Sequence, residues 1–357
     1  MRAMQLVEPA KPLVLREVEV PRPTGRQALV KVEACGVCHT DIHLSAGFYD
    51  LGEGRRMQLL ERGVVLPITL GHEIAGRTEA VGEDVADSSL KPGDPVIVYP
   101  WVGCGNCRNC AQGYENLCES KPRSIGIFVD GGYAEYVLVP DVKYLVEARD
   151  VTPAQAAPLA CSGITALSAV KKSGAAKDSL VVVMGAGGLG TTAVQLAKAA
   201  GAEVVAVDVN DSQLEVASKL GADRVLNAKE MAPEDVASSA KKLVEGRPID
   251  AALDFVGSEQ TFSAGFRMLG KGGRLVSVGL FGGQARFPLP IFVQREIALA
   301  GSFTGSLADL EELVELVRGG VVSPVVSEVL KLEDVNGALD RLRAGGVRGR
   351  MLVSPSG

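Results

Sequence analysis

The stretch VVVMGAGGLGTTAVQLAKA constrains the fold more than any other part of the chain. An apolar run typical of a buried strand leads directly into a glycine-rich turn, and a helical pattern follows. The turn has the spacing G-x-G-x-x-G. The first glycine of this motif permits a tight turn, the second lets a pyrophosphate approach the backbone, and the third lets helix and strand pack closely. We therefore expect a dinucleotide to bind at the N-terminus of this helix, on Gly185, Gly187, Gly188, Leu189 and Gly190.

An acid follows the turn at the expected distance. Asp208 closes the next apolar strand, where its carboxylate would accept hydrogen bonds from the adenosine ribose and repel a 2′-phosphate. The residues after it, VNDSQ, include no arginine or lysine to hold such a phosphate, so the sequence favours NAD over NADP. The alternative is a turn that only packs, with Asp208 capping the following helix. The order of strand, glycines, helix, strand and acid favours the cofactor.

The pattern of apolar runs and turns in the sequence changes near residue 160. Before about residue 150, short β-rich runs are separated by turns, which is typical of an all-β, barrel-like half. From about residue 178, near-continuous apolar strands alternate with helical stretches, which predicts a parallel sheet covered on both faces. The tail from about residue 302 has two helical patterns and a final strand, and its pattern alone does not assign it to either half. A chain of 357 residues accommodates two such cores.

Composition restricts the class of partner. The net charge is −6 and no lysine or arginine run is present, which argues against nucleic acid and favours a small molecule. No run reaches about 18 uninterrupted apolar residues, so no membrane span is expected. The N-terminus lacks the apolar stretch of a signal peptide, and we interpret the protein as cytoplasmic. Clustered cysteines in a reducing compartment are more often metal ligands or catalytic thiols than disulfides.

Four cysteines follow the pattern C-x2-C-x2-C-x7-C. This spacing lets a short loop wrap four thiolates around one tetrahedral Zn²⁺. A bacterial ferredoxin cluster needs its fourth cysteine after three residues and followed by proline, whereas seven residues intervene here and Glu119 follows. Four sulfur ligands leave no open coordination position, so the sequence predicts a structural zinc ion. Its ligands would be Cys104, Cys107, Cys110 and Cys118.

The other cysteines and histidines allow a second metal site. A catalytic zinc ion needs three protein ligands and one open position, and Cys38, His72 and Cys161 are candidates if the fold brings them together. Taken singly, each is better interpreted as a structural residue, with Cys38 and Cys161 as buried small side chains and His72 as a satisfied core histidine. Spacing alone therefore leaves this second site open.

The motifs taken together resemble a known family. GVCHTDIH, GHEIAG, the four-cysteine segment, DGGYAEYVLVP, CSGITA and GAGGLG occur in the order seen in zinc-dependent alcohol dehydrogenases of the medium-chain dehydrogenase/reductase superfamily. The resemblance covers essentially the whole chain and is greatest to archaeal and bacterial NAD-dependent enzymes. It implies an α/β protein with a GroES-like, β-rich catalytic domain (1–160 and 302–357) around a doubly wound parallel-sheet Rossmann domain that binds NAD (161–301).

The resemblance also implies roles around the metal. It makes Cys38, His72 and Cys161 the ligands of the catalytic zinc ion, in addition to the structural one. A cysteine as third ligand is typical of simple alcohol dehydrogenases rather than polyol dehydrogenases. The residues that surround the ligands in the family correspond to Thr40, which bonds the alcohol oxygen, His43, which ends a proton relay, Asp41, which orients His72, and Glu73, behind the metal.

Three further positions follow from the resemblance. His39 corresponds to a residue that contacts the cofactor, and Arg350 to an arginine that contacts its pyrophosphate, with Arg348 two residues away. Trp101, the only tryptophan, corresponds to a residue that lines the substrate pocket, although plain core packing is nearly as good an interpretation. Residues 47–67 form a longer excursion than simple family members need, either at the pocket mouth or at a subunit contact.

The function implied is an NAD(H)-dependent zinc alcohol dehydrogenase. It would interconvert primary or secondary alcohols with aldehydes or ketones by hydride transfer from a zinc-stabilised alkoxide. A related dehydrogenase for a polyol, semialdehyde or cyclic alcohol is the close alternative. A non-catalytic NAD-binding protein and a thiol redox sensor are alternatives of other classes. Relatives are commonly tetramers, so we expect a homotetramer, or a homodimer, in which the strand EIALAGS pairs between subunits.

Overall fold

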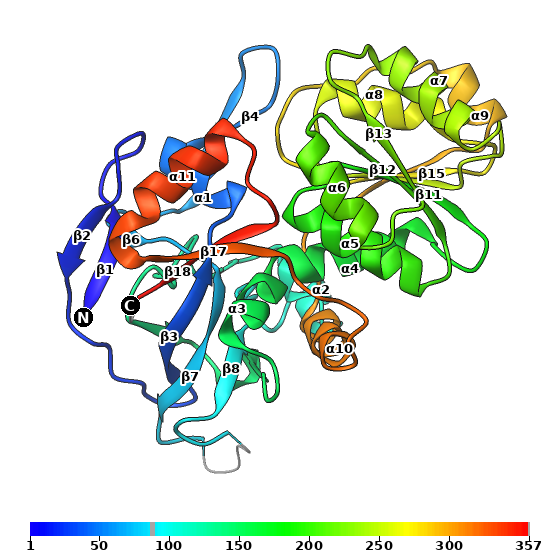
Figure 1. Cartoon of the computed structure of the whole chain (residues 1–357). Coiled ribbons are helices and arrows are strands. Elements are labelled where there is room, and N and C mark those ends of the chain that lie inside the picture. The colour runs from blue at the N-terminus through cyan, green and yellow to red at the C-terminus, as the bar shows by residue number, and fades with distance from the viewer. Residues whose placement is uncertain (86–89, 356–357) are drawn as a thin grey trace. The chain divides into compact units, whose positions relative to one another are not determined.

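The computed structural model describes residues 1–85 and 90–355 (Figure 1). The chain forms two compact units. The first contains Met1–Phe48, Gln58–Ile164 and the chain from Gly305 onward, and the second contains Tyr49–Met57 and Thr165–Thr304. The divisions lie at 164/165 and 304/305, and the short segment Tyr49–Met57 belongs to the second unit.

Two sheets form the first unit. The larger has the order β10-β8-β7-β3-β18-β17, with β9 also paired to β3, and the smaller has the order β2-β1-β6. The strands are β1 (Arg2–Leu6), β2 (Val14–Glu17), β3 (Ala28–Gly36), β6 (Ile68–Thr69), β7 (Glu73–Val81), β8 (Pro95–Val98), β9 (Tyr136–Val139), β10 (Leu145–Glu147), β17 (Val326–Lys331) and β18 (Arg350–Ser354). The predicted β-rich half is therefore confirmed.

The C-terminal tail completes this unit. β18 pairs antiparallel with β3, placing Leu352 opposite Gly36, and parallel with β17. Figure 1 shows α11 beside α1. The question that the sequence pattern left open is thereby answered, because the tail supplies two strands to the first unit. The helices of the first unit are α1 (His39–Ala46), α2 (Arg108–Ala111), α3 (Pro153–Ala156), α10 (Leu307–Arg318) and α11 (Val335–Ala344). Its short 3₁₀ turns are η1 (Leu60–Arg62), η2 (Glu115–Leu117), η3 (Val142–Tyr144), η4 (Ala157–Ala160) and η5 (Leu332–Asp334).

The second unit is the predicted doubly wound sheet. Its six strands are all parallel in the order β13-β12-β11-β14-β15-β16. The order reverses direction at β11, which is the position where such sheets bind ligands beyond the strands' carboxyl ends. The strands are β11 (Leu180–Met184), β12 (Glu203–Asp208), β13 (Arg224–Asn227), β14 (Ala251–Asp254), β15 (Arg274–Ser277) and β16 (Ala298–Gly301). The helices are α4 (Ser162–Ser173), which continues from the first unit, α5 (Gly188–Ala199), α6 (Asp211–Lys219), α7 (Pro233–Leu243), α8 (Glu259–Met268) and α9 (Leu289–Gln294).

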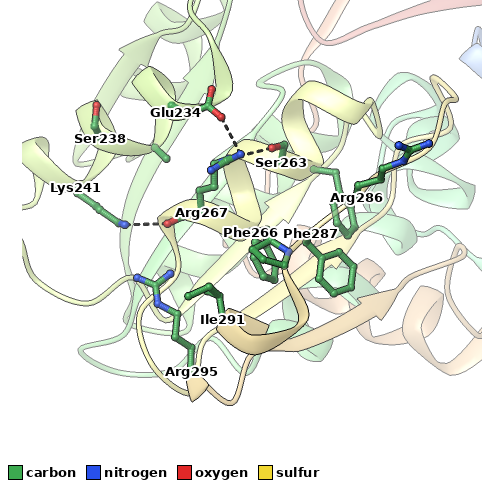
Figure 2. A pocket seen from close by; sticks show the side chains of 13 residues that line it. Glu234, Ser238, Lys241, Ser263, Phe266, Arg267, Arg286, Phe287, Ile291 and Arg295 are labelled. Carbon is green, nitrogen blue, oxygen red and sulfur yellow. Dashed lines mark hydrogen bonds and ion pairs between the residues drawn. The ribbon is translucent and has the colours of Figure 1, made fainter. Parts of the chain in front are cut away.

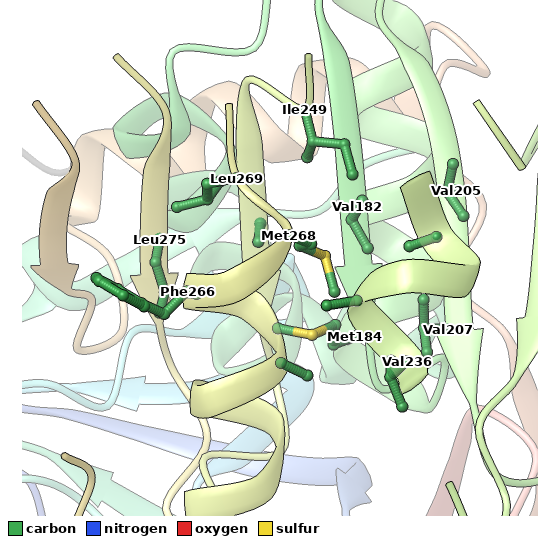
Figure 3. Packing of buried hydrophobic residues seen from close by; sticks show 14 of the residues in the cluster. Val182, Met184, Val205, Val207, Val236, Ile249, Phe266, Met268, Leu269 and Leu275 are labelled. Carbon is green, nitrogen blue, oxygen red and sulfur yellow. The ribbon is translucent and has the colours of Figure 1, made fainter. Parts of the chain in front are cut away.

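Burial on both faces explains the apolar strands of this sheet. Every residue of β11 is buried, as expected for a central parallel strand. On one face, Val182 and Met184 pack with Val205 and with side chains of α7 and α8 such as Phe266 (Figure 3). This core fixes the strand ends from which the glycine-rich turn and Asp208 project.

A small hairpin joins the second unit from far away in the sequence. It consists of β4 (Phe48–Asp50) and β5 (Arg56–Gln58). A Cβ added at Gly282 would lie 2.8 Å from the carbonyl oxygen of Asp50, and Gly282 also has a φ of 111°, so this close contact requires glycine. Arg286 adds an ion pair to Glu53 at 3.5 Å. The unusual segment 47–67 is thus held in part by the second unit.

In the described residues, no helix is both long enough and apolar enough to cross a membrane.

Candidate metal centres and cofactor turn

The four cysteines of the C-x2-C-x2-C-x7-C pattern converge. Their sulfur atoms all lie within 4.8 Å of one another. The Cys107 and Cys110 sulfurs are 3.4 Å apart and those of Cys104 and Cys110 are 3.9 Å apart, close to the roughly 3.8 Å that tetrahedral ligands with Zn–S bonds of about 2.3 Å require. Backbone N–H groups of Asn106 and Cys107 lower the pKa of Cys104 to about 6, which favours the thiolate. The donor set therefore fits one zinc ion.

A second group converges inside the first unit. Ligand atoms of Cys38, His72, Glu73 and Cys161 also lie within 4.8 Å of one another. Cys38 precedes α1, His72 precedes β7, and Cys161 lies between η4 and α4, so three element ends meet at this point. Both ring nitrogens of the buried His72 have no hydrogen-bond partner among the described residues. A buried imidazole without partners beside two cysteine sulfurs fits a metal site and is poorly explained as a satisfied core histidine.

Charges inside this cluster favour a metal-binding state. Cys161 donates its thiol hydrogen to Cys38, which lowers the pKa of Cys38 well below its usual value, with Arg350 and His72 adding to the shift. The same hydrogen bond, together with burial, raises the pKa of Cys161. One thiolate thus forms readily, and a cation at the site would favour the second.

Asp41 contacts two residues of this cluster, Cys38 and His72. One of its carboxylate oxygens accepts hydrogen bonds from the backbone N–H of Cys38 at 2.9 Å and from the hydroxyl of Tyr133 at 2.8 Å. The other oxygen lies 3.4 Å from Nδ1 of His72, which is an ion-pair distance without hydrogen-bond geometry. Sequence reasoning missed Tyr133, although it lies inside the motif DGGYAEYVLVP.

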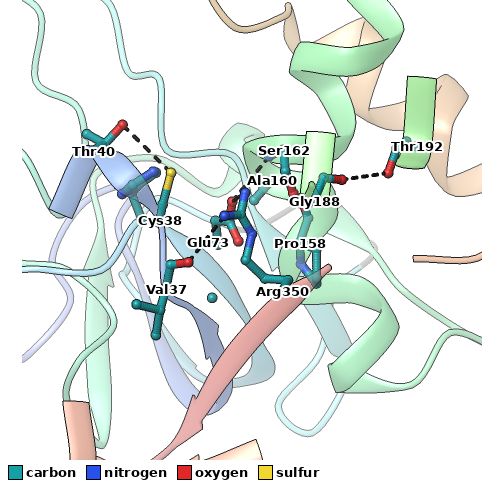
Figure 4. A network of polar contacts seen from close by, with 12 residues as sticks. Val37, Cys38, Thr40, Glu73, Pro158, Ala160, Ser162, Gly188, Thr192 and Arg350 are labelled. Carbon is teal, nitrogen blue, oxygen red and sulfur yellow. Dashed lines mark hydrogen bonds and ion pairs between the residues drawn. The ribbon is translucent and has the colours of Figure 1, made fainter. Parts of the chain in front are cut away.

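Glu73 and Arg350 form a buried ion pair beside the cluster. Their side chains are 2.9 Å apart, and Arg350 also donates to the carbonyl oxygen of Val37 at 3.2 Å (Figure 4). Burial raises the pKa of Glu73 to about 7, although Arg350 opposes the shift. The second carboxylate oxygen of Glu73 has no partner among the described residues, and a Cβ added at Gly36 would lie 1.9 Å from it. Only glycine at position 36 leaves room for this carboxylate.

Helix α1 carries three predicted polar residues in addition to Asp41. His39, Thr40 and His43 lie in its first two turns, after Cys38. The thiol of Cys38 is 3.8 Å from the hydroxyl of Thr40. Burial lowers the pKa of His43, and neighbouring His39 lowers it further. His43 is therefore neutral near pH 7, the form that accepts a proton.

Trp101 contacts two of the converging segments. Its ring packs edge-on against His72, with centroids 5.7 Å apart, and its indole N–H donates to the carbonyl oxygen of Ala160 at 3.2 Å. Ala160 directly precedes Cys161, and only 3% of Trp101 is exposed. Trp101 therefore contacts the candidate metal cluster, in addition to its predicted place in the substrate pocket.

The glycine-rich turn has the geometry of a phosphate cradle. Gly185 has a φ of 89°, and a Cβ at Gly190 would lie 1.9 Å from the Gly185 carbonyl oxygen, so both positions need glycine. A Cβ at Gly187 would meet nothing within 4 Å, which leaves open space at the start of α5. Such space beside free N–H groups fits a dinucleotide pyrophosphate.

Asp208 is tied to this turn. Its carboxylate accepts hydrogen bonds from the backbone N–H of Ala186 at 2.7 Å and of Asn210 at 3.0 Å. The cap of α6 is Asn210, whose side chain accepts from the N–H of Ser212. Asp208 is thus not the helix cap, and its place beside the glycines agrees with the cofactor interpretation.

Comparison with known proteins decides the family. The alcohol dehydrogenase GroES-like domain matches residues 24–150, and the zinc-binding dehydrogenase domain matches residues 188–319. The chain is 44% identical over 357 residues to NAD-dependent alcohol dehydrogenases of Sulfurisphaera tokodaii and Saccharolobus solfataricus, covering 99% of this chain and 100% of each relative. The chain belongs to the zinc-dependent alcohol dehydrogenase family.

Solved structures of this dehydrogenase family agree. The alcohol dehydrogenase of the hyperthermophilic archaeon Aeropyrum pernix matches with a TM-score of 0.88 at 37% identity, covering 99% of this chain and 100% of the other. A cobalt- and zinc-bound alcohol dehydrogenase from Pyrobaculum aerophilum matches with a TM-score of 0.84 at 32% identity, covering 99% of each chain. The predicted resemblance is confirmed.

Proposed function

We propose that the chain is an NAD(H)-dependent zinc alcohol dehydrogenase that interconverts primary or secondary alcohols with aldehydes or ketones. The observation that carries the proposal is the buried convergence of Cys38, His72 and Cys161 in a chain that also has the cradle-shaped glycine turn. The names of the archaeal relatives support NAD as the cofactor. Membership of the family supports zinc.

In this proposal, the chain has two domains with different roles. Residues 1–160 and 302–357 form the catalytic domain, and residues 161–301 bind NAD. Zinc held by Cys38, His72 and Cys161 would supply Lewis-acid stabilisation of the alcohol oxygen as its proton leaves. The second zinc ion, on Cys104, Cys107, Cys110 and Cys118, would stabilise its loop without taking part in the reaction.

NAD⁺ would accept the hydride from the alcohol carbon, and the side chains around the metal bind the substrate and move its proton. Thr40 hydrogen-bonds the alcohol oxygen and passes its proton toward His43, whose neutral imidazole accepts it. Asp41 fixes the orientation of His72, and Glu73 balances the charge behind the metal. Trp101 forms an apolar wall of the substrate pocket and excludes water from it.

The cofactor contacts are assigned in the same way. Gly185, Gly187, Gly188, Leu189 and Gly190 bind the pyrophosphate, and Asp208 binds the adenosine ribose. His39 and Arg350 are the further residues that we assign to cofactor contacts. The ion pair of Arg350 with Glu73 leaves its Nε without a hydrogen-bond partner among the described residues, which supports a further ligand there.

The deciding experiment is turnover on a panel of alcohols. Purified protein is mixed with aliphatic, benzylic, cyclic and polyol substrates and NAD⁺ or NADP⁺, and reduced cofactor is measured. Cys38→Ser should abolish NAD⁺-linked turnover, whereas Cys35→Ser, at a buried cysteine outside both clusters, should retain it. Activity that survives Cys38→Ser would contradict the mechanism. A ranking led by polyols or cyclic alcohols would select the alternative substrate classes.

We further propose a cytoplasmic homotetramer, or a homodimer, joined through β16. This strand ends the second sheet, so its outer edge has unpaired backbone groups within the described sheet. Large apolar side chains are exposed nearby in sequence, among them Phe281 at 73%, Leu289 at 66% and Val293 at 68%. Light scattering that gave a monomer mass at micromolar concentration would contradict the proposal.

A further inference from the structure

A cavity of about 450 Å³ lies in the second unit, apart from the proposed reaction site. It is lined by α7, α8 and α9 and by the segment 286–288 that leads into α9 (Figure 2). The lining includes no metal-cluster residue, no residue of the glycine-rich turn and not Asp208. Any ligand bound here would therefore be distinct from the proposed substrate and cofactor.

The floor of this cavity is aromatic. Phe266 and Phe287 have ring centroids 5.0 Å apart, and Phe262 lies 6.4 Å from Phe287. Ile291 of α9 extends the apolar surface. Such pre-packed aromatic surface offers apolar contact to a ligand without ordering flexible chains first.

The rim is strongly basic. Lys241, Arg267, Arg286 and Arg295 all line the cavity, whereas the single acidic residue is Glu234, which pairs with Arg267 at 2.8 Å. Figure 2 shows Lys241, Arg267 and Arg295 together at one side of Phe266. The rim therefore has an excess of positive charge.

Two of these cations have no acidic partner. Lys241 donates to the carbonyl oxygen of Arg267 at 2.8 Å, and no carboxylate in residues 1–85 or 90–355 forms an ion pair with Lys241 or Arg295. Burial lowers the pKa of Lys241, and the positive charge of Arg295 lowers it further. A bound anion would relieve this repulsion while its body covered the aromatic floor.

We propose that this cavity binds an organic anion with an apolar body, such as a medium-chain carboxylate. The head would contact Lys241 and Arg295, and the body would lie on Phe262, Phe287 and Ile291. The volume is within the range of small-molecule sites. A second copy docked here about a two-fold axis would bring the same cations together, so the charge favours a small anion over self-association.

Decanoate is the probe that tests the proposal. Isothermal titration calorimetry below its micelle concentration should give saturable binding to the wild type. Lys241→Gln combined with Arg295→Gln should raise the Kd at least about tenfold, the loss expected when a charge-assisted contact disappears. The matched control is Lys242→Gln combined with Lys271→Gln, which removes two exposed charges outside the cavity and should leave the Kd unchanged.

Further arms separate the sources of affinity. Acetate tests the head alone and decyltrimethylammonium tests the tail with reversed charge, and both should bind at least tenfold more weakly. Phe287→Ala should weaken decanoate but not acetate. Unchanged affinity in the Lys241/Arg295 double variant, or equal loss in the lysine control, would overturn the proposal. An assembled wild type that binds no decanoate would also overturn it.

Alcohol turnover distinguishes this inference from the proposed function. The Lys241/Arg295 double variant should oxidise alcohols with NAD⁺ at the wild-type rate, because neither residue lies in the reaction site. Failure of decanoate binding would leave the dehydrogenase proposal intact, and absence of turnover would leave the binding measurement valid.

Discussion

Trp101 links two zinc-ligand candidates through different parts of one side chain. Its ring faces His72, and its N–H reaches the residue before Cys161. We therefore expect Trp101 to fix the positions of both ligand candidates, in addition to any contact with substrate. The contribution of the N–H alone is separable by a substitution that keeps an aromatic ring.

We expect Trp101→Phe to release zinc faster than the wild type. The variant leaves the buried Ala160 carbonyl without its donor, which should cost about 1–3 kcal/mol of unfolding free energy and loosen the Cys161 segment. Tyr99→Phe is the matched control, because it removes a buried hydrogen bond of 2.8 Å to the carbonyl of Gly305. Both should lose similar stability, but a chromogenic chelator should detect faster zinc release only from Trp101→Phe. Equal release rates would show that Trp101 does not position the ligands.

The four-cysteine segment has little regular secondary structure of its own. It contains only the four-residue helix α2 and the three-residue turn η2, and Cys110 and Glu115 are the buried residues of these two elements. Elements this short do not fold on helix propensity alone. A metal ion at the convergence of the sulfurs would supply the missing stability.

Cys118→Ser should therefore separate structure from chemistry. We expect the zinc content to fall from about two ions per chain to about one, and the thermal midpoint to fall, because the segment loses one of four ligands. The kcat of the remaining folded protein should stay near the wild-type value. Elemental analysis, calorimetry and turnover measure the three quantities, with Cys38→Ser as the complementary variant. A complete loss of kcat in folded Cys118→Ser would contradict a purely structural role.

Asp223, directly before β13, makes hydrogen bonds whose contribution to stability should depend on pH. Asp223 accepts hydrogen bonds from the backbone N–H of Val204 at 2.7 Å and from Lys198 at 2.8 Å. Burial opposes ionisation of Asp223, but these bonds outweigh it and lower its pKa. The resulting stability is complete above the unfolded carboxyl pKa of about 4 and is lost as pH falls through the lower folded value. Asp223→Asn should thus cost more unfolding free energy at pH 7 than at pH 3, measured with urea. An equal cost at both pH values would contradict this assignment.

At the scale of the whole molecule, residues far apart in sequence meet in the buried pair of Glu73 and Arg350. We expect Arg350→Met to lower the unfolding free energy by about 3–5 kcal/mol, because Glu73 is left buried without its counter-charge. Adding Glu73→Gln should recover part of the loss. Arg341→Met, which breaks an exposed pair with Glu328, should cost under about 1 kcal/mol. Denaturant titrations of the wild type and the three variants measure these losses, and equal losses for both arginines would contradict the assignment.

The sequence predicted some features of the molecule better than others. The glycine turn and the four cysteines follow local spacing, so their chemistry was visible before any fold was known. The convergence of Cys38, His72 and Cys161 depends on three distant strand and helix ends, and only the family resemblance pointed to it. Tyr133 on Asp41 and the hairpin beside Gly282 had no local signal, because tertiary packing alone creates these contacts.

The place of β18 between β3 and β17 has a consequence for synthesis. A ribosome that has produced the whole of Thr165–Thr304 has supplied every strand of the second unit's parallel sheet. The first unit, begun earlier, still lacks two strands of its larger sheet and the arginine that neutralises Glu73. Because domains fold as they emerge, the half of the protein that is made first is completed last. Until the final residues appear, the Cys35–Gly36 end of β3 lacks its partner strand and is open to pairing with other chains.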